Sequence, residues 1–331
     1  MLFRRRPTYD VITIGDSVLD TFLHIQEASV ACELKRDECL LCMKFGEKLP
    51  LESVTRIPAA GNASNVAIGA ARLGWKSGIV SILGQDATGQ EIVAHWKKER
   101  VDTRYVQYDP KRPTNSHTVL HFQDERTILV YHQPRTYTLP ELKSTAWIYY
   151  TSLGKGHEPL EKQLLPWLDT HPETKLGFNP GTFQLQRGLK KLIPVLEHCT
   201  ALFVNKQEAQ RLLSTDEDKE TLLLSGLRRY GPKIVVITDG PKGACCFDGT
   251  TRLFCKAFPG KAVERTGAGD SFAMGFMHGL QETGSLAEAL RHGSAVSSQV
   301  ILKVGPHEGL PTRTALQALL HKHQKLQPKN V

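Results

Sequence analysis

Residues 262–279, AVERTGAGDSFAMGFMHG, are the most informative segment of the chain. The Gly-rich turn Gly267-Ala268-Gly269 precedes Asp270 and a helical run with small residues on one face. Glycines at a helix N-terminus allow backbone N–H groups to converge on an anion, because no side chain obstructs them. Asp270 can then accept a proton from a hydroxyl group beside that anion. An anion hole beside a carboxylate base is the minimum needed to move a phosphoryl group to an alcohol.

The same string has a plainer interpretation, in which the glycines form an ordinary turn and Asp270 caps the helix. The chain contains no GxxxxGK[ST] sequence, so a P-loop is excluded as the phosphate cradle. The choice between the two interpretations therefore depends on the rest of the chain.

Outside this stretch, short β-rich runs alternate with helical runs, which is typical of a parallel sheet with crossover helices. The expected strands are 9–15, 77–83, 147–151, 175–178, 201–204 and 233–238, with an antiparallel pair at 244–247 and 251–255. The expected helices are 65–73 (capped by Asn62 or Ser64), 89–100, 158–170, 206–213, 218–229, 267–281, 286–302 and 312–323. Residues 327–331 are expected to be a frayed tail.

Two segments interrupt the alternation, at about residues 21–57 and 116–133. Both contain β-rich stretches without a crossover helix, and 117–133 has the pattern of a hairpin that turns near Asp124-Glu125. Two such excursions from one body can meet as a small separate sheet over the strand ends, where the sheet acts as a lid. We therefore expect residues 1–331 to be a single α/β domain with an inserted β lid.

Seven groups of motifs follow one another along the chain. They are Gly15-Asp16-Ser17-x-x-Asp20; Ala60-Gly61-Asn62-Ala63-Ser64-Asn65-Val66-Ala67 with Arg72-Leu73-Gly74; Gly84-Gln85-Asp86-x-x-Gly89 with Val101-Asp102-Thr103; Asn179-Pro180-Gly181; Asn205-Lys206-Gln207-Glu208; Thr238-Asp239-Gly240-Pro241-Lys242-Gly243; and Glu264-Arg265-Thr266-Gly267-Ala268-Gly269-Asp270. In this order the chain resembles the ribokinase-like sugar kinases, also called the phosphofructokinase B (PfkB) family. The resemblance implies a three-layer α/β/α sandwich with a mostly parallel sheet, and an ATP-dependent carbohydrate kinase.

The resemblance also implies roles for residues on the ATP side. Asp270 is expected to be the catalytic base, and the backbone of Gly267, Ala268 and Gly269 to stabilise the charge on the transferred phosphoryl group. The remaining expected contacts are Asn205 and Glu208 with Mg²⁺ and phosphate (Glu208 through water), Thr238, Gly240 and Gly243 with ATP, and 292–299 with Gly305 beside the adenine.

On the acceptor side, two carboxylates, Asp16 and Asp20, follow a strand at the end where ligands bind in open α/β sheets. The resemblance adds Gly61, Asn62 and Asn65 to this site. The acceptor stays open between ribose, a ketose, a nucleoside and a sugar phosphate. A sugar phosphate needs a basic cluster, for which Arg104, Arg112 and Arg135 are candidates. In similar proteins β-rich lids pair into dimers, so a homodimer through the lid is expected.

The signatures depart from the family pattern at two positions. Glu264 stands where the family usually has an Asp that is linked to a monovalent cation site, so potassium activation is left open. Ala60 replaces a usual glycine, and its methyl group either narrows the acceptor pocket or has no effect.

Composition limits the partners and the compartment. The net charge is +8, which suits either nucleic acid or ATP as the partner. The basic residues are scattered rather than interleaved with aromatics, so ATP is favoured over a non-catalytic nucleic-acid binder of the same fold. The sequence shows neither a secretory h-region nor a run of the roughly 20 apolar residues that cross a bilayer. We therefore expect a cytoplasmic protein without membrane contact. Seven cysteines favour reduced thiols, and Cys32, Cys39 and Cys42 are expected to pack in the lid rather than bind a metal.

Overall fold

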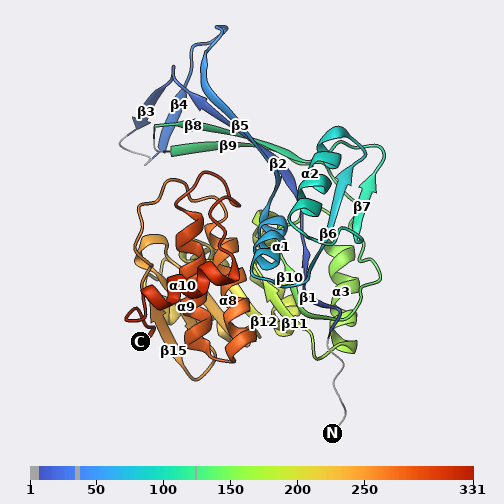
Figure 1. Ribbon diagram of the computed structural model, residues 1–331, viewed down its shortest axis with the longest axis vertical. Coiled ribbons are helices and arrows are strands. Elements are labelled where there is room, and N and C mark those ends of the chain that lie inside the picture. The colour runs from blue at the N-terminus through green and yellow to red at the C-terminus, as the bar shows by residue number, and fades with distance from the viewer. Residues whose placement is uncertain (1–6, 34–37, 124) are drawn as a thin grey trace.

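The apolar runs of the sequence become one ten-stranded sheet with the order β16-β15-β14-β13-β12-β11-β10-β1-β6-β7 (Figure 1). The structure is a computed structural model that describes residues 7–33, 38–123 and 125–331. Strands from β7 to β13 run parallel, and β13 to β16 are antiparallel. The strands are β1 (Tyr9–Ile14), β6 (Ser77–Gly84), β7 (Val106–Asp109), β10 (Thr145–Tyr150), β11 (Lys175–Phe178), β12 (Cys199–Asn205), β13 (Ile234–Thr238), β14 (Ala244–Phe247), β15 (Arg252–Cys255) and β16 (Lys329–Asn330).

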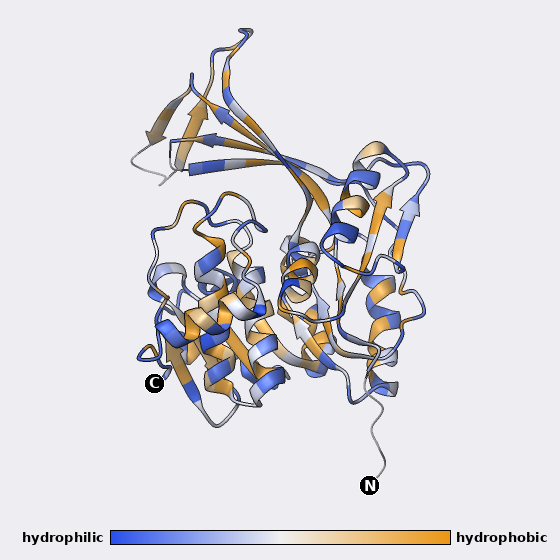
Figure 2. Ribbon diagram, in the orientation of Figure 1, coloured by the Kyte–Doolittle hydropathy of each residue, from blue (hydrophilic) through white to orange (hydrophobic). Residues whose placement is uncertain are grey.

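Helices cover both faces of this sheet, which gives the expected three-layer sandwich. On one face lie α1 (Asn62–Arg72), α2 (Ala87–Lys98), α8 (Ala268–Thr283), α9 (Leu286–Val300) and α10 (Arg313–Lys322). On the other face lie α3 (Glu158–Thr170), α5 (Leu189–His198), α6 (Lys206–Leu213) and α7 (Glu220–Arg228), with the short helices α4 (Thr182–Gln186) and η1 (Gly240–Lys242) in connections. Figure 2 shows hydrophobic residues concentrated along the strands of the large sheet, whereas the helices mix both kinds of residue. This is the pattern of a sheet buried on both faces.

The two segments that interrupt the alternation meet in a four-stranded sheet with the order β5-β2-β8-β9, which confirms the predicted small sheet (Figure 1). Its strands are β2 (Val18–Ile25), β5 (Leu51–Ala60), β8 (Ser116–Phe122) and β9 (Glu125–Tyr131). β2 pairs antiparallel with β5 and parallel with β8, and β8 and β9 form the predicted hairpin. Asp124, at the expected turn, lies outside the described residues.

Three local expectations need correction. Lys329 and Asn330 pair with β15, because they cover its free edge, so the tail is not frayed there. Helix α1 begins at Asn62, after Gly61, and Ser64 is not a cap: its Oγ lies 2.8 Å from Ser17 Oγ. Asp20 lies within β2 rather than in a loop after β1.

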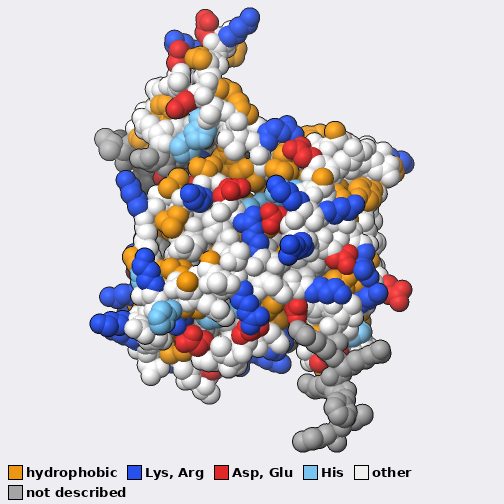
Figure 3. Space-filling model, in the orientation of Figure 1, with side chains coloured by type: hydrophobic (Ala, Val, Ile, Leu, Met, Phe, Trp, Pro, Cys, Tyr) orange, Lys and Arg blue, Asp and Glu red, His pale blue; other side chains and the backbone are white. Residues whose placement is uncertain are grey.

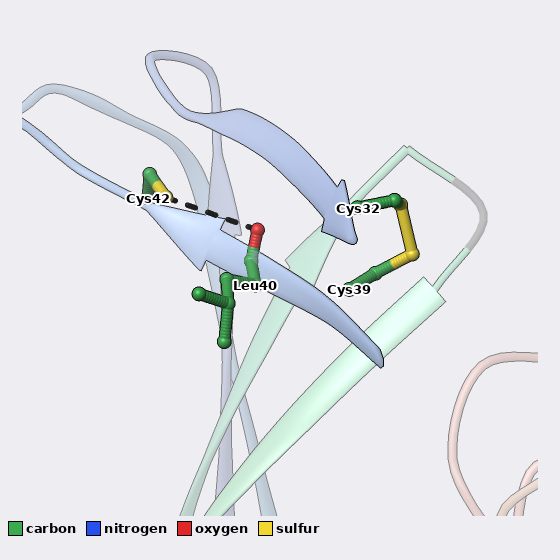
Figure 4. The surroundings of a disulfide bond; sticks show 4 residues. All are labelled: Cys32, Cys39, Leu40 and Cys42. Atoms are coloured by element: carbon green, nitrogen blue, oxygen red, sulfur yellow. Dashed lines mark hydrogen bonds between the residues drawn. A yellow bond between two sulfur atoms is a disulfide. The ribbon is translucent and has the colours of Figure 1, made fainter. Parts of the chain in front are cut away.

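The cysteine expectation is also wrong for one pair. Cys32 and Cys39 form a disulfide between β3 (Ser29–Glu33) and β4 (Glu38–Cys42), as Figure 4 shows. The antiparallel register places the two residues opposite each other, with Cα atoms 4.1 Å apart, which is close enough for a disulfide. Cys42 is exposed and free, and the other free cysteines of the described chain are buried.

No helix among the described residues is long and apolar enough to cross a bilayer.

Candidate active site

The Gly-rich turn adopts a backbone conformation that only glycine accommodates well. Gly267 has φ +75°, and a Cβ there would lie 2.6 Å from Pro306 Cβ. Helix α8 therefore begins at Ala268 directly after a left-handed residue. The first turn of α8 has backbone N–H groups without helical partners, as an anion site requires.

Asp270 lies in that first turn and is 6 % exposed. Burial raises the pKa of its carboxyl group to about 6, against a smaller lowering by the hydrogen bond from Asn65. Asn65 Nδ2 donates to Asp270 Oδ2 over 2.7 Å, and Asn65 Oδ1 lies 3.0 Å from His307 Nε2. The carboxylate is thus held by a side chain of α1 and is still largely ionised at pH 7.

Two adjacent pockets meet at this turn and share its residues. The smaller pocket, of about 290 Å³, has Asp270 in its wall. The larger pocket, of about 420 Å³, is lined by residues of η1 and α9. Of the residues expected at the site, the smaller pocket brings together Asn62, Asn205, Glu208, Thr238, Gly267, Ala268, Gly269 and Asp270. The larger pocket is lined by Thr238, Gly240, Gly243, Ala268 and Gly269.

Glu208 and Asn205 form a reciprocal cap at the start of α6. Glu208 Oε2 accepts from Asn205 N over 2.9 Å, and Asn205 Oδ1 accepts from Glu208 N over 2.9 Å. Burial raises the pKa of Glu208. One carboxylate oxygen of Glu208 therefore stays available on the pocket side, which suits a magnesium ion held through water. In the described part of the chain, no three His, Cys, Asp or Glu side chains are grouped to hold a metal by themselves.

The larger pocket is enclosed by segments that are far apart in the sequence. Gly243 has φ +111°, and a Cβ there would lie 2.2 Å from Cys255 O. Serines 294, 297 and 298 of α9 line the pocket, as does the loop from Ala257 to Ala262. Of the other residues expected beside adenine, His292 lines a different pocket, and Gly305 lies against Ile57 of β5.

The expected acceptor residues gather at the junction between the two sheets. Asp16 accepts from Tyr137 Oη at 2.9 Å and from Gly154 N at 2.9 Å, and its burial raises its pKa to about 6. Gly61 packs against it, because a Cβ on Gly61 would lie 2.7 Å from Asp16 O. Asn62 Nδ2 donates to Asn179 Oδ1 over 3.2 Å.

Asp20 contacts a histidine that the motifs did not indicate. Its Oδ1 lies 3.1 Å from His117 Nδ1, because β2 and β8 place the two residues side by side. His117 Nε2 is in turn 2.8 Å from His132 Nε2. The hairpin was predictable, but the inward direction of these two side chains depends on the strand register.

Glu264 is buried beneath the Gly-rich turn and meets a cation from the small sheet. Its Oε1 accepts from Thr266 N and Thr266 Oγ1 at 2.8 and 2.6 Å, and lies 3.4 Å from Arg126 Nη1. Arg126 also lines the pocket of Asp270, as does Arg265. Neither arginine was singled out as a site residue, because Arg126 lies in the hairpin and Arg265 was quoted only as part of the last motif.

The arginines proposed for a sugar-phosphate acceptor are already paired. Arg135 Nη1 lies 2.9 Å from Asp109 Oδ2, and Arg112 Nη1 lies 3.6 Å from the same oxygen. Arg104 Nε lies 3.0 Å from Asp102 Oδ2. They do not form a free basic cluster at the acceptor residues.

Known proteins with similar sequences are sugar kinases. The model of the pfkB family carbohydrate kinases matches residues 25–313. A 5-dehydro-2-deoxygluconokinase of Geobacillus kaustophilus is 25% identical over 80% of this chain and 85% of its own. A probable fructokinase-5 of Arabidopsis thaliana is 28% identical over 83% of this chain and 92% of its own.

Solved structures show the same fold. A nucleoside kinase of Methanocaldococcus jannaschii, described as an archaeal member of the ribokinase family, has a TM-score of 0.78 at 20% identity, covering 95% of this chain and 99% of its own. A ribokinase of Arabidopsis thaliana, complexed with ribose and ATP, has a TM-score of 0.76 at 21% identity, covering 94% and 98%.

The family model and these relatives define a carbohydrate kinase. The chain belongs to the PfkB family of carbohydrate kinases, whose model spans most of its length.

Proposed function

We propose that the enzyme transfers the γ-phosphoryl group of ATP to a hydroxymethyl group of a sugar or sugar-like acceptor, with Asp270 as the general base. The observation that carries this proposal is the position of Asp270, buried in the first turn of α8 where the two pockets meet. An ionised carboxylate there accepts the proton of the attacking hydroxyl, while the N–H groups of Gly267 and Gly269 stabilise the charge on the phosphoryl group. Ala268 N already donates to Arg265 O over 3.2 Å.

The larger pocket is the ATP site in this proposal. Thr238, Gly240 and Gly243 contact the phosphates and ribose, and the serines of α9 border the base. Arg265 lines both pockets, so its charge acts on the phosphates between them. Glu208 holds magnesium through water, with Asn205 beside it, and the ion neutralises phosphate charge when bound. Because ATP is the donor, we place the reaction in the cytoplasm.

The acceptor lies between Asp270 and the junction of the two sheets. Asp16 and Asp20 accept hydrogen bonds from its hydroxyl groups, and Gly61, Asn62 and Asn65 border it. The small sheet, which contributes Asp20 and Arg126, acts as a lid that excludes water once the acceptor binds. The paired state of Arg104, Arg112 and Arg135 argues against a sugar phosphate.

The guanidinium of Arg126 supplies a positive charge beside Glu264, 3.4 Å from Oε1. In this proposal, that charge takes the place of a monovalent cation, so potassium does not activate the enzyme. A potassium titration against a constant ionic strength tests the point, and activation by potassium alone would contradict it.

The outer face of the small sheet supports a homodimer. Of the sixteen exposed large hydrophobic side chains in the described residues, ten lie in 30–54 and 128–131. Leu129, Tyr131 and Val54 share the face of the small sheet that points away from Asp20. Light scattering is expected to give a dimer that Leu129→Glu dissociates, and a monomeric wild type would contradict the proposal.

ADP release from MgATP against a panel of sugars, nucleosides and sugar phosphates tests the kinase reaction and names the acceptor. Asp270→Asn is the control, because it keeps shape and removes the base. We expect release that depends on one acceptor and falls at least 100-fold in the variant. Equal turnover by both proteins on every acceptor would exclude Asp270 as the base.

A further inference from the structure

Four polar side chains form a row at the root of the small sheet. Asp20 Oδ1 lies 3.1 Å from His117 Nδ1, His117 Nε2 lies 2.8 Å from His132 Nε2, and His132 Nδ1 lies 3.9 Å from Asp16 Oδ2. The two rings are parallel, with an interplanar angle of 1°. The row thus joins the two acceptor-side carboxylates through two histidines, which come from β8 and from the end of β9.

Several atoms of this region are buried and have no hydrogen-bond partner among the described residues. They are His132 Nδ1, Asn115 Nδ2 and Arg135 Nε, and Asp20 Oδ1 has the contact with His117 Nδ1 alone. Asp20 is 5 % exposed and Asn115 is 1 % exposed. Asn115 is fixed beside the row, since its Oδ1 accepts from Gln133 N over 2.8 Å. Buried polar atoms without partners are costly, so a polar ligand that completes them is favoured.

A count of protons shows which atoms of the row accept hydrogen bonds. The distance of 2.8 Å between the Nε2 atoms requires one hydrogen between them. Burial, with the charges of His117 and Arg135, lowers the pKa of His132 to about 4, so His132 is neutral at pH 7. His117 Nδ1 faces the acceptor oxygen Asp20 Oδ1 at 3.1 Å, which favours the tautomer with the proton on Nδ1, and His132 then donates from Nε2. His132 Nδ1 therefore carries no proton, and its lone pair can accept a hydrogen bond.

We propose that this row selects the acceptor: His132 Nδ1 and Asp20 Oδ1 accept hydrogen bonds from hydroxyl groups of an uncharged polyhydroxy compound, and sugar acids and sugar phosphates are rejected. The inference rests on the kinase function proposed above and narrows its acceptor class. Among the described residues near the row, Asn115 Nδ2 and Arg135 Nε are the donors without a hydrogen-bond partner. An anion would meet two carboxylates and a lone pair.

The charged groups that face the row support this selection. Tyr137 Oη already donates to both oxygens of Asp16, at 3.1 and 2.9 Å. Arg135 is the nearby cation that enters the pKa shifts of Asp16 and His132. Its Nη1 is bonded to Asp109 Oδ2 at 2.9 Å and its Nη2 to Pro113 O, so those atoms are not available to an anionic acceptor. The row therefore offers acceptors to neutral hydroxyls, whereas an anion would find only Asn115 Nδ2 and Arg135 Nε as unpaired donors among the described residues.

The test uses the full chain with D-fructose, D-ribose, D-gluconate and D-ribose 5-phosphate as acceptors. We expect phosphorylation of at least one of the neutral sugars and of neither anion. His132→Phe should raise KM for the neutral acceptor by about 10- to 100-fold with little change in kcat, because it removes one hydrogen bond. His132→Lys should raise the ratio of kcat/KM for anion over neutral at least tenfold. His121→Phe is the matched control, because His121 also lies on β8 but its ring contacts that of His24, and its effect should stay within about twofold.

Two measurements separate this inference from the kinase proposal. Turnover of D-gluconate or D-ribose 5-phosphate in preference to both neutral sugars would overturn the selection and leave the kinase standing. If no acceptor is phosphorylated, the kinase proposal fails, and the binding of the four compounds is measured by calorimetry. Tighter binding of the neutral sugars supports selection by the row, whereas equal or tighter binding of the anions overturns it. ¹⁵N NMR of the wild type is independent of any variant's folding, and an imidazolium at His132 at pH 7 would also overturn it.

Discussion

Asn65 Nδ2 donates a hydrogen bond of 2.7 Å to Asp270 Oδ2, and so links the first turn of α1 to the first turn of α8. The bond favours the ionised carboxylate and lowers its pKa against the effect of burial. Asn65→Leu should therefore raise the pKa of Asp270 above its present value of about 6. The acid limb of the profile of kcat/KM against pH should move to higher pH, and an unmoved limb would show that the bond does not tune the base.

The acid limb of the wild type provides a second prediction. A general base must be ionised, so kcat/KM should fall as one proton binds below pH of about 6, where Asp270 titrates. Asp16, also raised to about 6, adds a second proton over the same range. The measurement is the pH profile in buffers of constant ionic strength, and a flat profile down to pH 5 would contradict both assignments.

Asp270→Asn should stabilise the protein while it abolishes catalysis. The carboxyl group has a pKa of about 6 when folded, against an ordinary value of 3.8 for an aspartate. A raised pKa means that the folded state binds the proton more tightly, so this contribution to stability is lost as pH rises through about 6. The variant should gain about 3 kcal/mol in the free energy of unfolding at pH 8, and less at pH 5. Urea denaturation at both pH values checks the result, and a gain independent of pH would exclude this cause.

Substitution of Arg126 should lower kcat/KM more than substitution of an ordinary surface arginine. Arg126→Met removes the only side chain of β9 that reaches Glu264 among the ion pairs of the described residues. We expect kcat/KM to fall about 10- to 100-fold, which corresponds to about 1.4 to 2.7 kcal/mol of lost interaction. Arg56→Met is the matched control, since Arg56 lies on β5 of the same sheet and pairs with Glu91 of α2 at 2.7 Å. Equal losses in the two variants would show that the effect comes from removing a positive charge and not from breaking the Arg126–Glu264 pair.

Gly267→Ala should lose both stability and activity. Its φ of +75° strains any side chain, and the new Cβ meets Pro306 Cβ at 2.6 Å. Gly46 has a similar φ of +77° with nothing within 4 Å, so Gly46→Ala isolates the strain from the collision. The control should lose about 1 kcal/mol and keep its activity, whereas Gly267→Ala loses more and turns over poorly. Thermal melts and ADP release measure the two effects, and parallel behaviour of the variants would contradict the explanation.

The order of elements and the region of Asp270 were predictable because both depend on local sequence. The strand at Tyr9, the helix after Gly267 and the hairpin from 117 follow from apolar periodicity and glycines. The histidine row was not predictable, because the contact of Asp20 with His117 depends on which residues of β2 and β8 are opposite each other. The same holds for the Cys32–Cys39 disulfide, which is set by the register of β3 and β4.

The chain passes from β1 of the large sheet to β2 of the small sheet over Gly15, Asp16 and Ser17. Asp20 therefore belongs to one sheet, while Asp270 belongs to a helix on the other. Substitutions in the small sheet, other than at Arg126, can change which molecule is held without altering the turn beside Asp270. In evolutionary terms the two halves of the site are separable, so acceptor preference can diverge between descendants while the phosphate chemistry is inherited unchanged.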